Sequence, residues 1–553
     1  MISKVRNYFS KGYLVNDLIA GVTIAALTIP TSMGYAQIAG LPPVYGLYAA
    51  IFPVVFFALF ASSRQVIVGI DASSGAIAGS LIAAAGIIPN TPEAIIFIPV
   101  ATFFTSLFML LFSLTDVRRL IVYVSEPVMG GTICGIALSV AFSQLPKLGD
   151  VSASGSNSLQ KAVYLFTHLN EINWLSLVLS LLALTLIIVS KKRYPKLPTP
   201  LLILIGFTAI SALFNFDRYD LSLVGEIPQG LPPVVIPQLM TAPSLFLAVI
   251  GGLLTALVLT TDSLLTSLKF SEGSQKPLKE KKELFAFSLA NLVSSFSGGA
   301  PINASVSRTA ANQQAKGKTQ VVSLVAASVI SIILIFFSNF LFFMPQGVLA
   351  AIVLSAVLTV ILAELKFLQR LFQNSRRESI IWLAAMITVL LSGVLLGLFL
   401  GILLSFVLII VARMNSFSAF LGRDPETGRY IDLARNESAI KVPGVIIYRF
   451  SNALFFSNIS QLIIDLDKQL KDRPETKTII IEAYGITMID TTAAKKLRFF
   501  MMELQQKDIQ LYFVNTIGSF RDSLVKRQLD DLFPLEELLH SVEDGLNKAN
   551  QTK

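Results

Sequence analysis

Apolar segments long enough to cross a bilayer follow one another almost without interruption from residue 17 to residue 413. A membrane-spanning helix needs roughly 20 mostly apolar residues, and division at charges, prolines and glycine clusters gives about fourteen segments, seven in each half. They lie near 17–39, 41–61, 71–88, 91–114, 124–145, 172–190, 197–214, 243–268, 284–299, 303–315, 319–342, 346–364, 379–394 and 395–413. Because lipid cannot satisfy unpaired backbone groups, we expect a polytopic α-helical membrane protein.

The composition argues against an enzyme. Only 14% of the residues are charged, against about 25% in soluble chains, and the charges gather after residue 410. The single cysteine, Cys134, cannot build a disulfide framework or a thiolate metal site, and His168 and His540 are far apart. We therefore expect neither an enzyme nor a bound cofactor.

The positions of the basic residues predict the orientation of the segments. With a cytoplasmic N-terminus, the cytoplasmic loops hold most lysines and arginines of the region, and the opposite loops hold only Lys147, Lys161 and Arg218. This is the bias of the positive-inside rule. It predicts a lipid-embedded, multi-pass protein of the plasma or inner membrane with both termini in the cytoplasm. It also accounts for the net charge of +9 without a nucleic-acid partner.

The chain divides into four parts. Residues 1–16 are polar and basic and lack a signal-peptide core, so we expect a cytoplasmic N-terminal segment before a membrane domain over 17–415. A linker over 416–439 then leads to a soluble domain over 440–553. In that domain the strand-like runs VIIYRF, TIIIEA and IQLYFVN alternate with amphipathic helical stretches, which predicts a small α/β domain. It has no glycine-rich phosphate loop, so nucleotide hydrolysis is not indicated.

Two of the membrane segments, the third of each seven, are short and begin in polar sequence. One begins within SSRQVIVGIDASSG and the other within SSFSGGAPINASVSR. Paired interrupted segments are typical of a transporter site at the membrane midplane. Half-helices that start there present unpaired N–H groups and positive dipole ends, which together bind an anion. The alternative is that both stretches are ordinary loops between full spans.

The second of these half-helices carries the candidate residues for an anion site. Ala304 and Ser305 stand at its start after Asn303, and Ser307 and Arg308 follow within about a turn. An arginine at membrane depth is costly and is a functional candidate by default. Arg308 either lies near the substrate, or it only braces helix ends or pairs with an acid.

Two acids also lie in the membrane region. Asp71, at the start of the first half-helix, is a good N-cap; alternatively it pairs with Arg308, or it is protonated or cation-bound during transport. Asp262 shares one helix face with Thr266, four residues later. Such oxygen ligands suit a hard cation such as Na⁺, and the carboxylate alone can carry a proton. The alternative for Asp262 is a structural carboxylate hydrogen-bonded to serines.

The first segment contains a proline that should break or kink its helix. Pro30 is followed by Thr31 and Tyr35, which then fall on one face just past the break. These two side chains either line the cavity with a hydroxyl group and an aromatic ring or serve packing alone.

Three stretches resemble one known family. DLIAGVTIAALTIPTSMGYAQIAGLPPVYGLYAAIFPVVFFALFASSR looks like the opening signature of the sulfate permease (SulP) anion transporter family, and SVSRTAANQQAKGKTQ resembles its tenth-helix motif. IIIEAYGITMIDTTAAKKL resembles the core of a STAS domain. The resemblance implies two inverted seven-helix repeats divided into core and gate domains, a cytoplasmic STAS domain, and often a homodimer.

The resemblance also implies roles for particular residues. By motif position the anion site would be formed by Thr31, Tyr35, Asp71, Ala72, Ala304, Ser305, Ser307 and Arg308. DSLLTS is similar to the sodium-binding segment of cyanobacterial bicarbonate transporters, which would make Asp262 and Thr266 cation ligands. In the STAS part, Thr491 stands where related regulators are phosphorylated, although a threonine that only belongs to a helix cap is the commoner case.

The sequence departs from the family pattern at two places near the expected site. Pro30-Thr31 replaces the usual proline-glutamine pair, and Gly69-Ile70 followed by Asp71 replaces the usual glycine-proline. The added acid favours coupling to a cation or proton over passive conduction.

The leading hypothesis is therefore a secondary active transporter for a small anion such as sulfate, bicarbonate or a similar oxyanion or carboxylate. It would be coupled to Na⁺ or H⁺ and work by alternating access. The alternatives are an uncoupled anion exchanger or channel, and a membrane-tethered regulatory module in which the STAS domain, with a regulatory partner, does the work.

Overall fold

The computed structural model describes residues 11–115, 125–153, 158–194, 199–237, 241–271, 277–414, 418–534 and 538–551. Contacts divide the chain into two units, Met1–Phe406 and Val407–Lys553, which are described separately here. Within the described residues, six helices are long and apolar enough to cross a membrane, and four shorter apolar helical stretches accompany them.

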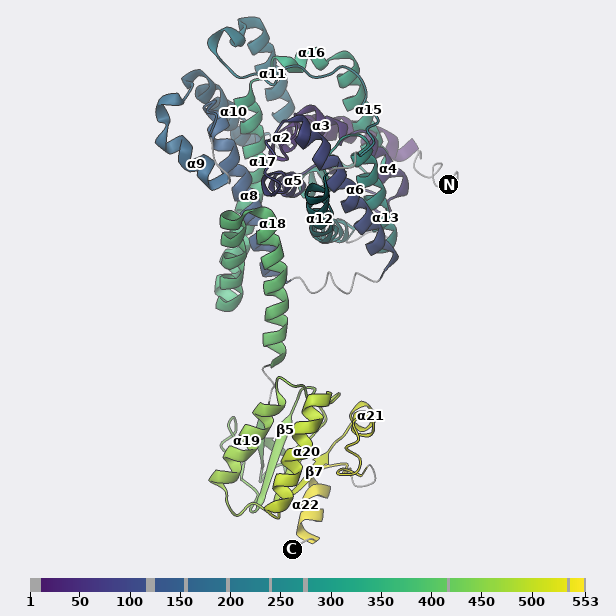
Figure 1. The fold of residues 1–553 in the computed structure, drawn as a ribbon, viewed down its shortest axis with the longest axis vertical. Coiled ribbons are helices and arrows are strands. Elements are labelled where there is room, and N and C mark those ends of the chain that lie inside the picture. The colour runs from purple at the N-terminus through teal and green to yellow at the C-terminus, as the bar shows by residue number, and fades with distance from the viewer. Residues whose placement is uncertain are drawn as a thin grey trace. The chain divides into compact units, whose positions relative to one another are not determined.

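The first unit is almost entirely helical (Figure 1). Its elements are α2 (Lys11–Ile38), α3 (Val44–Tyr48), α4 (Phe52–Phe60), β1 (Val68–Gly69), α5 (Ala72–Ala84), α6 (Pro92–Leu114), α8 (Glu126–Leu148), α9 (Ser158–Thr167), α10 (Trp174–Arg193), α11 (Thr199–Phe214), α12 (Ala242–Lys269), α13 (Glu280–Phe296), β2 (Asn303–Ala304), α14 (Val306–Gln314), α15 (Val321–Phe336), α16 (Ser338–Phe342) and α17 (Gln346–Asn374), with 3₁₀ turns at Leu169–Glu171 and Phe216–Tyr219. The long helix α18 (Arg376–Met414) crosses the division between the units.

These helices correspond to the predicted segments. The two interrupted segments are the short helices α5, with 13 residues, and α14, with 9 residues, each preceded by a two-residue strand. The last two predicted segments are joined in α18, which breaks at Gly393, where φ is 81°. A glycine accepts this left-handed conformation without a Cβ penalty, so the chain changes direction there.

The helices of the first unit pack as two bundles. One, the core bundle, consists of α2, α4, α5, α6 and α12 to α15, and the other, the gate bundle, of α8, α10, α11, α17 and the start of α18. Helix α2 also touches α17 and α11, and α5 touches α8. Figure 1 shows α2 and α17 between α8 and α10 on one side and α4, α6 and α13 on the other.

Small residues let α5 approach α2 closely. A Cβ added to Gly75 would lie 2.8 Å from the carbonyl oxygen of Tyr35, and one added to Gly79 would lie 2.2 Å from that of Ile38. Close backbone packing of this kind stabilises helix pairs in lipid, where no hydrophobic force drives association. It fixes the first turns of α5 beside the C-terminal end of α2.

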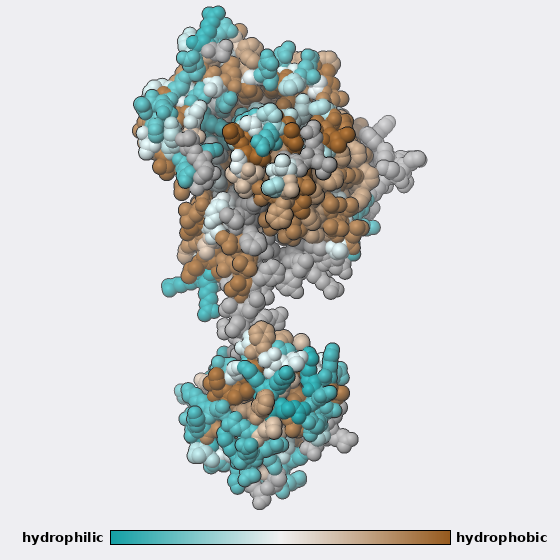
Figure 2. All heavy atoms as spheres, viewed as in Figure 1, coloured by the Kyte–Doolittle hydropathy of each residue, from teal (hydrophilic) through white to brown (hydrophobic). Residues whose placement is uncertain are grey.

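The first unit exposes a large apolar surface. Only 22% of the apolar stretch of α10 is buried within the structure. Figure 2 shows extensive hydrophobic colouring over the first unit, whereas polar residues dominate the visible face of the second. An exposed apolar surface of this extent on a soluble protein would aggregate, so these helices face lipid.

The second unit is a mixed sheet covered by helices. Its elements are β3 (Ser418–Arg423), β4 (Tyr430–Asp432), β5 (Val445–Phe450), α19 (Ile459–Asp472), β6 (Thr478–Glu482), α20 (Thr491–Gln506), β7 (Gln510–Val514), α21 (Gly518–Lys526) and α22 (Val542–Gln551). The strand order is β4-β3-β5-β6-β7, with β5, β6 and β7 parallel and β3 antiparallel to both of its neighbours.

The sheet begins earlier than the sequence predicts. Strands β3 and β4 lie within residues 416–439, for which the sequence predicts a linker. β4 has only three residues, all half-buried, and β3, although it has six residues, lacks a continuous buried run. The predicted strands within 445–450, 478–483 and 509–515 are present as β5, β6 and β7, because their buried apolar runs give a stronger signal.

Candidate functional site

The starts of the two half-helices are joined by a small antiparallel sheet. Val68 of β1 pairs with Ala304 of β2, and Gly69 pairs with Asn303. The ladder continues because the backbone N–H of Ser305 donates to the carbonyl oxygen of Ile67 at 2.9 Å. Since α5 follows β1 and α14 follows β2, this pairing brings the N-termini of both helices to one place, as the interrupted segments predict.

Ser305 and Arg308 shape the N-terminus of α14. The Ser305 hydroxyl group accepts a hydrogen bond of 3.4 Å from the backbone N–H of Arg308 and lies 3.2 Å from the Ser307 hydroxyl group. The N–H groups of Val306 and Ser307 lie in the same first turn, where no intrahelical acceptor exists. Ser307 is exposed and Ser305 is fully buried, so the exposed part of this turn is centred on Ser307.

The guanidinium group of Arg308 lies across the small sheet. It is 3% exposed, donates to the carbonyl oxygen of Ile70, and donates to the Ser32 hydroxyl group at 3.4 Å. A Cβ added to Gly69 would lie 2.7 Å from its Nη1 atom. Arg308 thus braces α14 against the end of β1 and against α2, and it adds a positive charge beside both helix N-termini.

Asp71 is the N-cap of α5. Its carboxylate accepts the N–H of Ala72 at 2.8 Å, and its own N–H donates to the Ser74 hydroxyl group at 2.9 Å, which completes a capping box. Of the three roles that the sequence leaves open, the structure favours the cap. The Asp71 carboxylate makes no ion pair with Arg308, although both residues lie in the described part of the chain.

Asp262 of α12 connects the start of α5 to the strand before α14. Its Oδ2 atom accepts hydrogen bonds from Ser73 Oγ at 3.1 Å and from Asn303 Nδ2 at 2.7 Å, and Asn303 Nδ2 also donates to Ser73 Oγ at 3.0 Å. The neighbouring Ser263 Oγ accepts the N–H of Ala304 at 3.2 Å. One turn of α12 therefore holds the first turn of α5 and the strand before α14 together.

One acceptor in this cluster is unused. Asn303 is fully buried, and its Oδ1 atom finds no hydrogen-bond donor among the residues that the structure describes. Leaving a buried acceptor unsatisfied costs about 1–3 kcal/mol, which a bound cation, proton donor or water can recover. Oxygen atoms of Asp262, Asn303 and Ser73 form the kind of ligand set that Na⁺ accepts.

The remaining predicted residues lie around this centre in different ways. Thr266 is buried one turn after Asp262, but the hydrogen bonds of Asp262 go to Ser73 and Asn303. The Thr31 hydroxyl group donates to the Leu27 carbonyl oxygen at 2.7 Å within its own helix. Tyr35 is 4% exposed and lies within electrostatic reach of Asp71 and Arg308.

Sequence reasoning missed Ser73, Ser263 and the unpaired oxygen of Asn303 as part of the site. A local signal existed for Ser73, which follows Asp71 in the same polar interruption. Nothing local linked it to Asp262, which lies 189 residues away.

Thr491 is the first residue of α20 in the second unit. The preceding Asp490 caps the helix, with Oδ1 accepting the N–H of Ala493 at 2.7 Å and Oδ2 accepting that of Phe456 at 2.8 Å. Thr491 itself is exposed. The structure therefore gives the helix cap to Asp490 and leaves the Thr491 side chain on the surface.

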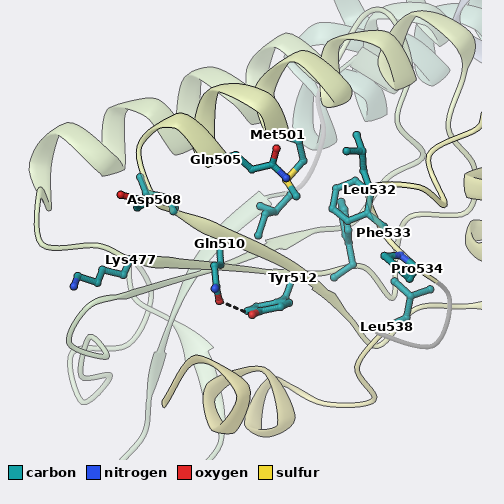
Figure 3. Close-up of a pocket in the computed structure, with 13 residues that line it drawn as sticks. Lys477, Met501, Gln505, Asp508, Gln510, Tyr512, Leu532, Phe533, Pro534 and Leu538 are labelled. Atoms are coloured by element: carbon teal, nitrogen blue, oxygen red, sulfur yellow. Dashed lines mark hydrogen bonds between the residues drawn. The ribbon is translucent and has the colours of Figure 1, made fainter. Parts of the chain in front are cut away.

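A separate cavity of about 550 Å³ lies in the second unit, between the end of α20 and strand β7 (Figure 3). Met501, Phe513 and Phe533 form part of its apolar lining, and the Tyr512 hydroxyl group donates to Gln510 Oε1 at 2.5 Å along its strand side. It belongs to the sheet domain alone and lends no residue to the cluster around Asp262.

Comparison with known proteins identifies the class of this fold. The chain belongs to the sulfate permease family, whose model matches residues 14–385, and a STAS domain model matches residues 438–543. A probable sulfate transporter of Mycobacterium tuberculosis is 28% identical over 531 residues, which cover 95% of this chain and 93% of that protein. The chloroplastic sulfate transporter 4.1 of Arabidopsis thaliana is 29% identical over 574 residues, covering 99% and 82%.

Solved structures agree on the architecture. The murine Slc26a9 anion transporter, in an inward-facing state, superposes with a TM-score of 0.91 at 20% identity, covering 100% of this chain and 93% of that one. The transmembrane domain of a cyanobacterial bicarbonate transporter, BicA, gives 0.60 at 21% identity, covering 71% and 97%. The fold is that of a helical membrane transporter with a C-terminal STAS domain, with which fourteen spans are consistent. The matched relatives are transporters rather than enzymes.

Proposed function

We propose that this chain is a secondary active transporter of a small oxyanion, with sulfate as the first candidate and bicarbonate as the second. The names of its relatives support sulfate, and the BicA neighbour supports bicarbonate. The anion is held between the N-termini of α5 and α14 and is carried by alternating access of the core bundle against the gate bundle.

The observation that carries this proposal is the position of Asp262. It connects Ser73 at the start of α5 to Asn303 just before α14. The Oδ1 atom of this Asn303 has no donor within the part of the chain that the structure describes. Asp262 is half-buried, and a carboxylate withdrawn from water in this way is costly unless it is fully paired or neutralised. A Na⁺ ion or a proton at this point neutralises Asp262 and fixes both helix starts, so that cation binding prepares the anion site.

The anion would lie on the other face of the same helix starts. The unpaired N–H groups near Ser307, the helix dipoles and the Arg308 guanidinium group all present positive charge there. Because Arg308 already binds Ile70 and Ser32, it acts mainly through its charge and by holding α14 in place. Thr31, Tyr35, Asp71, Ala72, Ala304, Ser305 and Ser307 complete the proposed site.

The alternative is an uncoupled exchanger or channel. The capping box of Asp71 favours it in one respect, because a capping carboxylate is explained without any coupling role. This alternative gives no role to the half-buried Asp262 or to the unused Asn303 oxygen. We therefore prefer the coupled form, with Asp262 and Thr266 rather than Asp71 on the cation side.

The proposal extends to the surroundings of the site. The distribution of lysines and arginines supports a plasma or inner membrane location with both termini in the cytoplasm. A homodimer and a regulatory partner of the STAS domain, with Thr491 as an exposed site for phosphorylation, belong to the same proposal.

Purified protein in proteoliposomes tests the function. Labelled sulfate, bicarbonate, chloride and a dicarboxylate are offered separately, with inward Na⁺, inward H⁺ or no cation gradient. The proposal predicts accumulation of one oxyanion that depends on one of the two cation gradients. Equal uptake without either gradient would support the exchanger or channel.

A further inference from the structure

A lysine and a glutamine join the two bundles at the C-terminal ends of α8 and α2. Lys147 Nζ donates to Gln37 Oε1 at 3.0 Å, although the residues are 110 positions apart. Gln37 belongs to the core bundle and Lys147 to the gate bundle. In the proposed orientation both helices end at the outer side of the membrane.

Both ends are held firmly within their own bundles. Beside Lys147, the carbonyl oxygen of Leu148 accepts a hydrogen bond of 3.1 Å from Ser176 of α10. Beside Gln37, the carbonyl oxygen of Gly40 accepts the N–H of Asn90 at 2.8 Å. Because each partner is anchored separately, movement of one bundle against the other must break the bond between Lys147 and Gln37.

The packing of α17 shows that the bundles are closed at this end. Residues 347–355, at the outer end of α17, are buried on every side, whereas further along only Val357, Ile361, Leu368 and Leu371 are buried, on one face. At the outer end, a Cβ added to Gly34 of α2 would lie 1.9 Å from Val353 Cγ2. The described contacts between α2 and α17 therefore seal the outer half of the interface.

The contact between Lys147 and Gln37 is energetically unfavourable for a purely structural role. A half-buried ammonium group loses hydration, and a neutral amide returns only part of the lost energy. A small oxyanion would bind the same ammonium group more strongly, because its charge assists the hydrogen bond. The bond to Gln37 is thus strong enough to hold a closed gate and weak enough for an anion to replace it.

We propose that Lys147 is the outer gate residue of this transporter and exchanges Gln37 for the arriving anion when the outer side opens. The proposal rests on the alternating-access function proposed above and adds the residue pair that controls entry. Breaking the pair should favour the outward-open state, and making it an ion pair should favour the closed state.

Thiol labelling in proteoliposomes tests the gate without requiring a transported anion. The chain has a single cysteine, so a Cys134→Ser, Val353→Cys background places one thiol at the sealed interface between α2 and α17. A membrane-impermeant maleimide then reports how often the outer side opens. Lys147→Met removes the bond, and Gln37→Glu turns it into an ion pair of nearly the same shape. Arg218→Met, at an exposed position in the 3₁₀ turn Phe216–Tyr219, is the control for loss of outer positive charge.

The proposal predicts an order of labelling rates among the variants. Lys147→Met should be labelled roughly tenfold faster than the background, because it loses a hydrogen bond made by a charged group. Gln37→Glu should be labelled more slowly than the background, and its anion uptake should require a higher anion concentration. The double variant Gln37→Lys, Lys147→Gln should restore the background labelling rate. This result would show that changes at these two positions do not prevent folding. Arg218→Met should be labelled at the background rate.

The outcomes distinguish failure of the gate proposal from failure of the proposed transport function. Equal labelling of the Lys147→Met, Arg218→Met and background proteins overturns the gate, even if the background protein takes up sulfate. Faster labelling of Gln37→Glu overturns it as well. The expected labelling order, combined with no cation-dependent uptake of any anion tested, would keep the gate and overturn the proposed coupled function instead.

Discussion

The side-chain amide of Asn303 donates a hydrogen bond of 2.7 Å to the carboxylate of Asp262 and at the same time directs an unpaired oxygen into the protein interior. The first residue lies in the strand before α14, and the second lies about two turns before the C-terminal end of α12. Through Ser73, the same carboxylate also reaches α5. The two half-helices therefore share one acid, and changes at this acid should affect both.

Asn303→Ala should reduce initial anion uptake at saturating cation by at least about tenfold, because it removes a hydrogen bond to a charged group worth about 1.5–3 kcal/mol. Ser73→Ala should have a smaller effect, since its neutral hydroxyl group donates over 3.1 Å. Uptake by the two variants in proteoliposomes, at several cation concentrations, measures the order. A larger loss in Ser73→Ala would contradict the central place given to Asn303.

Gly69→Ala should displace the Arg308 guanidinium group. The added Cβ would lie 2.7 Å from Nη1, and the φ of 155° at this position is unfavourable for alanine. We expect near-complete loss of uptake with normal expression. Gly206→Ala, in α11, is the matched control, because an added Cβ there meets no atom within 4 Å. Retention of full uptake in Gly69→Ala would show that Arg308 need not be held at this place.

Asp71 should behave as a helix cap and not as a coupling group. Asp71→Asn keeps an acceptor for the N-terminus of α5 and should retain most of the uptake and its cation dependence, whereas Asp71→Ala should lose about 1 kcal/mol of stability. Thermal unfolding in detergent and uptake in proteoliposomes are measured side by side. If Asp71→Asn abolishes cation dependence while its unfolding temperature is unchanged, Asp71 is a coupling residue.

Glu283 should be important for stability rather than for transport chemistry. Its fully buried carboxylate accepts the N–H groups of Ser62 at 2.7 Å and Ser63 at 2.9 Å, and the Ser267 hydroxyl group at 3.2 Å. It thereby fixes the loop that leads into β1. Glu283→Ala leaves these donors unpaired and should cost about 3–5 kcal/mol, as for other broken buried charge contacts.

Thermal unfolding of detergent-solubilised protein checks this prediction. Glu378→Ala, at an exposed position in the first turn of α18, serves as the control and should unfold at the wild-type temperature. Equal unfolding temperatures for the Glu283 and Glu378 variants would be incompatible with the anchoring role.

The half-helices are predictable from sequence because their signal is local. Asp71 before a run of small residues, and Asn303 to Ser305 before Arg308, mark helix starts wherever they occur in a chain. The fourteen apolar segments follow from length and composition in the same way. The break of α18 coincides with Gly393, which separates two predicted segments.

The contacts within the site are not predictable in this way. Ser73 and Asn303 lie 189 and 41 residues from Asp262, and only the packing of three helices brings them together. The bond between Lys147 and Gln37 likewise joins residues that are 110 positions apart. Strands β3 and β4 are hard to predict for a different reason. β4 has only three residues, all half-buried, and β3 has six residues but lacks the continuous buried run of β5.

Uptake of labelled oxyanion by wild-type and Asp262→Asn proteoliposomes, with and without inward Na⁺ and H⁺ gradients, tests the central claim most directly. Asparagine keeps the shape of the side chain but can neither neutralise a cation nor carry a proton. We expect cation-driven accumulation by the wild-type protein and none by Asp262→Asn, with Glu226→Gln, an acid in a loop, behaving as wild type. Accumulation by Asp262→Asn with unchanged dependence on the gradient would contradict the account.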